Sequence, residues 1–126
     1  MLLARALAAE DAAQIAGFAA FLGHCYPIWL KFQGGKGVAT FFGLLFALAW
    51  PMGVVAGATW LAIAAIFRYS SLAALLTAAL MPLWTMVFDF RHLFPLSLGL
   101  ACVIYWRHRE NIIRLIRGQE SKIGKK

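Results

Sequence analysis

A run of glycines around one lysine is the stretch whose residue types point most directly to chemistry. Gly34, Gly35, Lys36 and Gly37 stand between two apolar segments. Glycines let the backbone approach a ligand closely and turn N–H groups toward it, and a lysine adds positive charge, so the run is typical of an anion site. It is not a Walker A loop, because Leu30 stands where that motif has its first glycine and Gly37 replaces its serine or threonine. The alternative is an ordinary turn between membrane helices with an interfacial lysine.

A histidine and an asparagine near the C-terminus form a second candidate pair. His108 and Asn111 lie three residues apart and share a helix face, which suits proton transfer and hydrogen bonding. Glu110 and Arg114 are four apart and predict an ion pair on another face. The alternative for His108 is contact with lipid headgroups among the neighbouring arginines. The sequence has no paired carboxylates, metal-ligand spacing or Ser/His/Asp set, so we expect neither hydrolase chemistry nor a metal site.

The composition predicts an all-α, polytopic integral membrane protein. Of 126 residues, 63% are hydrophobic and 13% charged, and a mean hydropathy of +0.77 leaves too little polar surface to cover a soluble globule. The net charge of +7 is not accompanied by a basic patch with interleaved aromatics, so we expect no nucleic-acid partner. Cys25 and Cys102 lie in apolar runs and are expected to be buried free thiols. Residues 1–11 do not fit the pattern of a cleaved signal peptide.

Five apolar segments must position the candidate residues, and we expect them to form one membrane domain over residues 1–126. The second segment has only thirteen residues, which suits a short helix beside a binding site better than a full crossing of about 30 Å. The last segment continues to Arg117 as an amphipathic helix that leaves the membrane. Ser70 and Ser71 precede the fourth segment and are expected to cap it. The five segments are residues 12–30, 38–50, 52–67, 72–88 and 93–106.

A histidine in the first segment is a further candidate. Ala16, Ala20 and His24 are spaced by four residues and therefore share one stripe of the helix. Small residues let membrane helices pack closely, so we expect this stripe to face other helices and to carry His24 inward. An ionisable residue within a membrane segment is a candidate for function. The alternative is a histidine that hydrogen-bonds a carbonyl near Pro27 and only fixes packing.

Threading the five helices through a membrane assigns ten of the twelve basic residues to one side. The positive-inside rule makes that side cytoplasmic. The same side receives the glycine run, the Ser70-Ser71 turn and residues 107–111, so three polar clusters meet where a water-soluble anion could reach a lipid-soluble substrate. Arg5 and Arg91 fall on the opposite side. The ten are Lys31, Lys36, Arg68, Arg107, Arg109, Arg114, Arg117, Lys122, Lys125 and Lys126.

Four motifs, in this order, resemble those of the bacterial membrane glycerol-3-phosphate acyltransferases that use acyl phosphate, the PlsY family. They are Gly23-His24-Cys25-Tyr26-Pro27, the run from Leu30 to Thr40, Arg68-Tyr69-Ser70-Ser71-Leu72, and His108-Arg109-Glu110-Asn111-Ile112 followed by Gly118, Glu120, Lys122 and Gly124. The resemblance implies acyl transfer from acyl phosphate to the 1-hydroxyl of sn-glycerol 3-phosphate. The product would be lysophosphatidic acid for phospholipid synthesis, made without coenzyme A as donor and without a cofactor. The family's place is the bacterial inner membrane, with the site and the C-terminus on the cytoplasmic face.

The resemblance also implies a role for each matching residue. His108 and Asn111 would be catalytic, and Glu110 and Glu120 would support the local structure. Substrate would be bound by His24, Gly34, Gly35, Lys36, Gly37, Thr40 and Ser71. The partners would be acyl phosphate, glycerol 3-phosphate and membrane lipid.

The N-terminal part departs from the family pattern. Members usually have two further membrane helices there, joined by a loop rich in serine, glycine, asparagine and arginine. No such loop precedes Ala12, and residues 1–11 look like the end of the second of those helices. We therefore expect this chain to lack the family's first two helices. Two other functions stay open: a non-catalytic membrane subunit descended from the enzyme, and a small membrane transporter.

Overall fold

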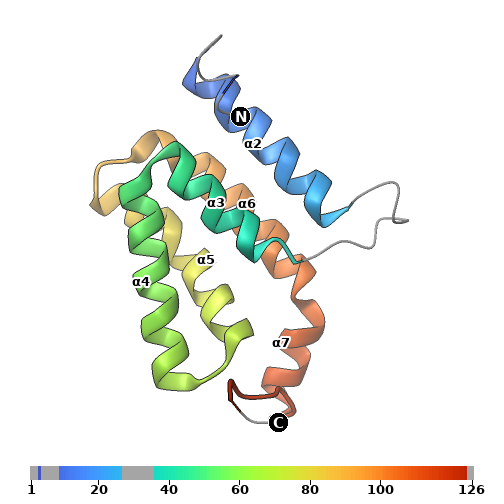
Figure 1. The fold of residues 1–126 in the computed structure, drawn as a ribbon. Helices are drawn as coiled ribbons and strands as arrows, with labels where there is room; N and C mark the ends of the chain where they lie inside the picture. The colour runs from blue at the N-terminus through green and yellow to red at the C-terminus, as the bar shows by residue number, and fades with distance from the viewer. Residues whose placement is uncertain (1–2, 4–8, 27–35, 125–126) are drawn as a thin grey trace.

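The computed structural model of the chain describes Leu3, residues 9–26 and residues 36–124. These described residues form helices and no strand, so the predicted all-α fold is confirmed. Figure 1 shows the helices as a bundle with the C-terminal end folded under the start of α5. The elements are α2 (Glu10–Cys25), α3 (Val38–Leu48), α4 (Trp50–Phe67), α5 (Ser70–Val87), the 3-10 turn η2 (Arg91–Leu93), α6 (Phe94–Arg107) and α7 (Arg109–Ile116).

Helix α5 is the centre of the bundle, because it packs against both α4 and α6, while α3 packs on α4. Its inner positions are mostly small or flexible: Ala73, Ala78 and Met81 are fully buried. Small side chains let neighbouring helices come close, and this close approach improves the van der Waals packing that helps helices associate in a membrane. Helix α2 lies along the side formed by α3 and α6 (Figure 1). Helix α5, which begins at Ser70, is therefore held between α4 and α6.

The second predicted segment is short, as expected, but it ends earlier than predicted. Helix α3 stops at Leu48, and Ala49 takes an extended conformation with φ −154° and ψ 93°. Helix α4 begins at Trp50, with Pro51 in its first turn. A proline is tolerated there because the first helical N–H groups have no partner within the helix. The predicted segments 38–50 and 52–67 leave Pro51 between two helices, whereas it belongs to the first turn of the second one.

Two of the described helices are long and apolar enough to cross a membrane. Helices α4 and α5 each have 18 residues, with mean hydropathies of 1.7 and 1.6. Apolar side chains on their outer faces are exposed; Leu61, for example, is 63% exposed. Such faces suit contact with lipid, and Cys102 is exposed in the same way, which corrects its expected burial. The number of complete crossings stays a prediction, because α2 and α6 have 16 and 14 described residues.

The predicted inward stripe of α2 is wrong by one position. The buried residues are Ala13, Gly17, Phe21 and Cys25, whereas His24 is exposed. Helix α2 has small or apolar residues on nearly every face, so spacing alone fits several stripes. The large ring of Phe21 decides between them, because it packs into the space left by the missing side chain of Gly37. The part of the predicted segment after residue 26 lies outside the described residues.

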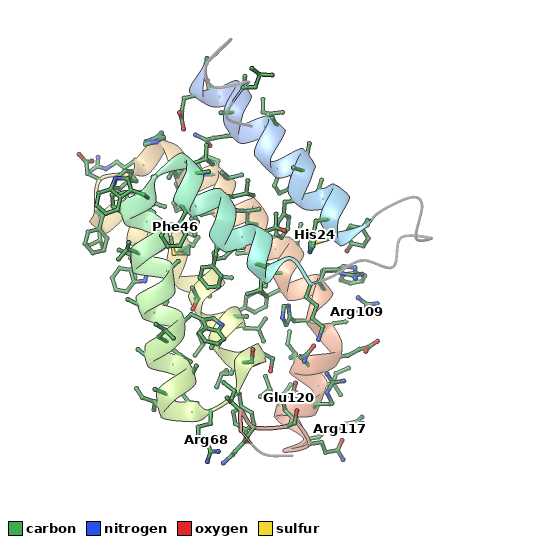
Figure 2. The ribbon with its side chains drawn as sticks, viewed as in Figure 1. His24, Phe46, Arg68, Arg109, Arg117 and Glu120 are labelled. Atoms are coloured by element: carbon green, nitrogen blue, oxygen red, sulfur yellow. The ribbon has the colours of Figure 1, made fainter. Side chains whose placement is uncertain are left out.

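The basic residues of the described chain separate toward two ends of the bundle, as the threading predicts. Arg68 and Arg117 lie at the end that also holds Glu120, and Arg109 lies farther up, where α7 begins (Figure 2). The loop between α5 and α6, which contains Arg91, lies at the opposite end (Figure 1). One end of the bundle is therefore strongly cationic, and the threading predicts that the polar clusters of the site meet at this end.

Candidate active site

A cavity of about 310 Å³ lies at the cation-rich end, where the starts of α3 and α5 meet the junction of α6 with α7. Its volume is at the lower end of the roughly 300–1,000 Å³ usual for small-ligand sites. Charged, hydroxyl and amide groups all reach it. The lining residues are Lys36, Val38, Ser70, Ser71, Ala74, His108, Asn111, Glu120 and Ser121.

His108 stands at a break between α6 and α7. Its φ of −98° and ψ of 11° interrupt the helical geometry, although its N–H still donates to the carbonyl of Ile104 at 2.9 Å. Its own carbonyl accepts from the N–H of Ile112 at 2.9 Å. The predicted uninterrupted helix to Arg117 is therefore two helices joined at this residue. Both His108 and Asn111 are buried beside the cavity, which confirms that they share a face.

The His108 ring is held in one tautomer. The side chain is 3% exposed, and its Nδ1 lies 2.8 Å from the carbonyl oxygen of Ile104. A carbonyl oxygen can only accept, so Nδ1 carries the hydrogen and the neutral ring keeps its free lone pair on Nε2. Burial lowers the pKa of His108; the charges of Lys36 and Arg107 also lower it, against opposite effects of the Ile104 hydrogen bond and Glu120. The ring is thus neutral at pH 7, with Nε2 able to accept a proton.

Glu120 connects three side chains from two helices. Its Oε2 accepts from Ser71 Oγ at 3.1 Å and from Asn111 Nδ2 at 2.9 Å, while Oε1 lies 3.4 Å from Arg114 Nε. The carboxyl side chain is 9% exposed. Burial alone would raise the pKa of Glu120, but the hydrogen bonds from Asn111 and Ser71 and the nearby Arg114 outweigh it and lower the pKa. Glu120 is therefore ionised, and its oxygens are occupied by these donors.

Asn111 lies between a cation and an anion, so the orientation of its amide is determined. Lys36 Nζ donates to Asn111 Oδ1, and Asn111 Nδ2 donates to Glu120. Since a lysine only donates and a carboxylate only accepts, exchanging the amide O and N would lose both bonds. A continuous chain of hydrogen bonds thus runs from Lys36 through Asn111 and Glu120 to Ser71.

The structure brings together five of the residues selected from the sequence. Lys36, Ser71, His108, Asn111 and Glu120 all line the cavity. The others are placed elsewhere: His24 is exposed at the end of α2, apart from Glu120 (Figure 2), Thr40 is half-buried in α3, and Glu110 is exposed on α7. Gly34 and Gly35 lie outside the described residues.

Two local predictions at this end are wrong. The first concerns the Ser70-Ser71 cap: α5 begins at Ser70, its N-cap is Tyr69 without a side-chain bond, and the Ser71 hydroxyl donates to Glu120. The second concerns Arg114, which forms its ion pair with Glu120 rather than with Glu110. Both differences have one cause, because the chain after α7 folds back and brings Glu120 within reach of α5 and α7.

Ser121, Val38 and Ala74 are cavity residues that the sequence did not identify, whereas Ser70 was expected at this side of the membrane but was not selected as a site residue. Ser121 reaches the cavity because the chain turns at Gly118, and this glycine was the only hint of the turn in the sequence around it. Gly118 stops α7 in the left-handed conformation with φ 68°. Glycine adopts this conformation without strain, and it reverses the chain at a helix end. A stop at Gly118 could be predicted, but the direction of the chain beyond it could not.

Gly37 has a structural role, which leads to a first prediction. Its φ is 84°, and a Cβ there would lie 2.6 Å from the Phe21 ring and 2.9 Å from Cys25 Sγ. Phe21 and Cys25 are fully buried and have little room to move. We expect Gly37→Ala to destabilise the fold by about 2–4 kcal/mol, from left-handed strain and overpacking together. The measurement is the midpoint of thermal unfolding in detergent.

Gly43→Ala is the matched control for this variant. Gly43 is also in α3, but a Cβ there would meet nothing within 4 Å. It should leave the midpoint unchanged or raise it slightly, since alanine favours helix more than glycine does. Equal midpoints for the two variants would contradict the close packing of α2 on Gly37.

Comparison with known proteins identifies the family. The family described as glycerol-3-phosphate acyltransferase matches residues 1–118. A glycerol-3-phosphate acyltransferase of Dinoroseobacter shibae is 60% identical over 126 residues, which are all of this chain and 62% of that protein. One of Caulobacter vibrioides is 57% identical over 129 aligned residues, which include all of this chain and 59% of that protein. The chain thus spans about 60% of the length of these relatives.

Solved structures agree with this assignment. The glycerol 3-phosphate form of PlsY, an integral membrane glycerol 3-phosphate acyltransferase, superposes with a TM-score of 0.90 at 34% identity, covering 98% of this chain and 63% of that one. Its lysophosphatidic acid form also gives a TM-score of 0.90, with 64% of that chain covered. Sequence and fold therefore lead to the same conclusion: the chain belongs to the glycerol-3-phosphate acyltransferase family.

Proposed function

We propose that this chain forms the site at which an acyl group passes from acyl phosphate to the 1-hydroxyl of sn-glycerol 3-phosphate. The observation that carries the proposal is the hydrogen-bonded chain from Lys36 through Asn111 and Glu120 to Ser71, in one cavity with the neutral His108. The solved relatives with glycerol 3-phosphate and lysophosphatidic acid carry the acceptor and the product of this reaction. Both phosphate-bearing substrates suit a cavity at the cationic end of the bundle.

For this reaction the protein needs mainly to position the two substrates, to stabilise the negative charge and to supply one proton acceptor. The 1-hydroxyl oxygen attacks the acyl carbonyl carbon, and an ester bond forms as the bond from that carbon to the phosphate oxygen breaks. Inorganic phosphate leaves with the electron pair of that bond, and the hydroxyl proton passes to a base. Because acyl phosphate is an activated mixed anhydride, holding the reactants together supplies much of the rate enhancement.

His108 is the proton acceptor in this proposal. Its free Nε2 lone pair follows from the Nδ1 bond to Ile104, and its position at the cavity puts it next to Asn111 and Lys36. Lys36 lowers the pKa of the ring as long as its charge is unbalanced. A bound phosphate would balance that charge, so substrate binding itself would make His108 a stronger base. Glu120 is unsuited to this role because it is ionised with a low pKa and already accepts three donors.

Lys36 and Ser71 are the substrate-binding groups in this proposal. A lysine ammonium binds phosphate as a point charge, and Lys36 is exposed at the cavity. The Ser71 hydroxyl donates to Glu120 and keeps its own lone pairs for a donor on the substrate, such as a hydroxyl. Gly34, Gly35, Gly37, Thr40 and His24 remain candidate contacts from the family resemblance alone.

The proposal places one membrane domain in the bacterial inner membrane, with the site and the C-terminus in the cytoplasm. The cation-rich end supports this orientation through the positive-inside rule. We expect His92→Cys and Ile123→Cys, each in a chain whose Cys25 and Cys102 are replaced by alanine, to be labelled from opposite sides. An impermeant maleimide applied to inverted and right-side-out vesicles makes the measurement. Labelling of both from one side would contradict the topology.

The test of the function uses this chain joined to the segment of the Dinoroseobacter shibae relative that it does not span. The purified protein receives radiolabelled glycerol 3-phosphate with either acyl phosphate or acyl coenzyme A. We expect labelled lysophosphatidic acid with acyl phosphate only. Product formed from acyl coenzyme A but not from acyl phosphate would contradict acyl phosphate as the donor. No product from either donor would contradict the proposed acyl transfer. Flux of labelled glycerol 3-phosphate into liposomes without product would favour a transporter.

The neutral state of His108 also predicts a pH dependence of stability. Its folded pKa lies below the ordinary value of 6.5, so the unfolded chain takes up a proton first as the pH falls. The folded state must therefore lose stability as the pH falls from 6.5 to the lower pKa of the folded chain. Glu120 acts in another window: its lowered pKa stabilises the fold above its ordinary value of 4.5, and this stabilisation is lost as the pH falls through the folded pKa.

We therefore expect acidification from about pH 7.5 to about pH 5 to destabilise the wild type more than His108→Gln, which cannot titrate. The midpoint of thermal unfolding in detergent, at one scan rate, makes the comparison. Parallel shifts of the two midpoints across this range would contradict a lowered pKa at His108.

A further inference from the structure

The residues after α7 form part of the cavity wall, and they are fastened at a point away from it. We call residues 119–124 the C-terminal strap. It follows the turn at Gly118, where the N–H of Gln119 donates to the carbonyl of Arg114 at 2.7 Å. The strap supplies two cavity residues, Glu120 and Ser121. Its position therefore determines where the Glu120 carboxylate stands relative to Asn111 and Ser71.

Arg68 fastens the far end of the strap to the connection between α4 and α5. The N–H of Ile123 donates to the carbonyl of Arg68 at 2.6 Å, and Arg68 Nη2 donates to the carbonyl of Ile123 at 2.9 Å. Next to this two-way contact, Lys122 Nζ lies 5.7 Å from the centre of the Tyr69 ring. Figure 2 places Arg68 and Glu120 at the same end of the bundle. The strap is thus bound on both sides of its cavity residues, by Arg114 before them and Arg68 after them.

The backbone of Arg68 gives an independent sign that its side chain matters. Arg68 ends α4 in the left-handed conformation, with φ 61° and ψ 29°. A residue with a Cβ pays roughly 1–2 kcal/mol for this conformation, and glycine would adopt it without that cost. An arginine here keeps the strain but gains the bond to Ile123. The hydrogen bond from Arg68 to Ile123 offsets part of the cost of the left-handed backbone. This gain explains why an arginine, rather than a glycine, suits this position.

We propose that Arg68 is a positioning residue of the site, acting through the strap to hold Glu120 against Asn111 and Ser71. Arg68 itself does not line the cavity. Its guanidinium bonds to Ile123 and so reduces the freedom of the strap. The strap in turn holds the Glu120 carboxylate in place, and that carboxylate orients the amide of Asn111. The effect on catalysis rests on the proposed function, whereas the effect on the strap does not.

The first test measures the strap without any substrate. In the 126-residue chain in detergent, hydrogen exchange of the peptide covering residues 119–124 should be faster in Arg68→Ala than in the wild type. Alanine keeps the left-handed strain of residue 68, so the comparison isolates the side-chain bond. Arg117→Ala, which removes an exposed cation from the same end, should leave the exchange unchanged. Equal exchange in the wild type and Arg68→Ala would overturn the proposal, whatever the activity.

The second test measures catalysis in the chain joined to the Dinoroseobacter shibae segment. Arg68→Ala should lower kcat about three- to tenfold, the equivalent of one ordinary hydrogen bond, with little change in KM for glycerol 3-phosphate or in the unfolding midpoint. Arg68→Lys keeps a donor and should recover most of the loss. Faster strap exchange with kcat within twofold of the wild type would overturn the positioning role. No activity in the wild-type protein would instead overturn the proposed function, while the exchange result still decides whether Arg68 holds the strap.

Discussion

His108→Gln should lower kcat by about 10²–10⁴-fold, the contribution usual for a general acid or base. The proposal makes His108 Nε2 the acceptor of the hydroxyl proton, and glutamine offers no nitrogen that can take one up. The change affects a group needed mainly in the transition state, so KM for glycerol 3-phosphate should stay within about threefold. Steady-state kinetics with acyl phosphate, in the chain joined to the segment of its relative, makes the measurement.

His92→Gln is the matched control for this prediction. His92 is an exposed histidine in the 3-10 turn at the other end of the bundle, so the same substitution there should leave both constants unchanged. Two further results would give information about the role of His108. A raised KM with an unchanged kcat would make His108 a binding residue only. Unchanged kinetics would show that this cavity is not the reacting centre.

The meeting of Lys36, Ser71 and His108 could be predicted because membrane helices alternate in direction. Once the apolar segments are counted, each polar connection is assigned to one side, and these three residues fall on the same side. No contact had to be known for this step, since the periodicity of apolar and polar segments is a local property of the chain. The structure places all three at one cavity.

The position of Glu120 could not be predicted in the same way. Its contact with Ser71 joins residues 49 positions apart, and it depends on the left-handed turn at Gly118 and on the strap held by Arg68. The periodicity of apolar residues gives no information on the path of a polar segment that folds back after the last helix. The neighbours of Glu120 therefore looked like separate features: Ser71 as a cap, and Arg114 as a partner of Glu110.

The orientation of α2 failed for a different physical reason. Its residues are small or apolar on almost every face, so the stripes containing His24 and Phe21 are nearly equivalent by spacing. What separates them is volume, because the Phe21 ring fits against the bare backbone of Gly37. Such complementarity between two distant segments becomes visible only when both are placed together.

Lys36→Met should impair both binding and turnover, and the two effects should have different sizes. Methionine keeps most of the length of the side chain but removes the charge. Losing a charge-assisted hydrogen bond to phosphate corresponds to about 1.5–3 kcal/mol, so KM for glycerol 3-phosphate should rise about 10- to 100-fold. Lys36 also donates to Asn111 Oδ1, so kcat should fall as well. That fall should be smaller than the rise in KM, because Glu120 still holds Asn111 through Nδ2.

Arg117→Met separates a specific contact from a general loss of positive charge. Arg117 lies at the same cationic end, so its loss weakens the long-range attraction of anions by a similar amount without touching the cavity. Long-range attraction is screened by salt over about 10 Å at 0.1 M, whereas a direct contact is screened much less. The effect of Arg117→Met should therefore be small and vanish as salt is added, and that of Lys36→Met should persist. Equal, salt-sensitive effects of the two variants would show that Lys36 attracts the substrate without binding its phosphate.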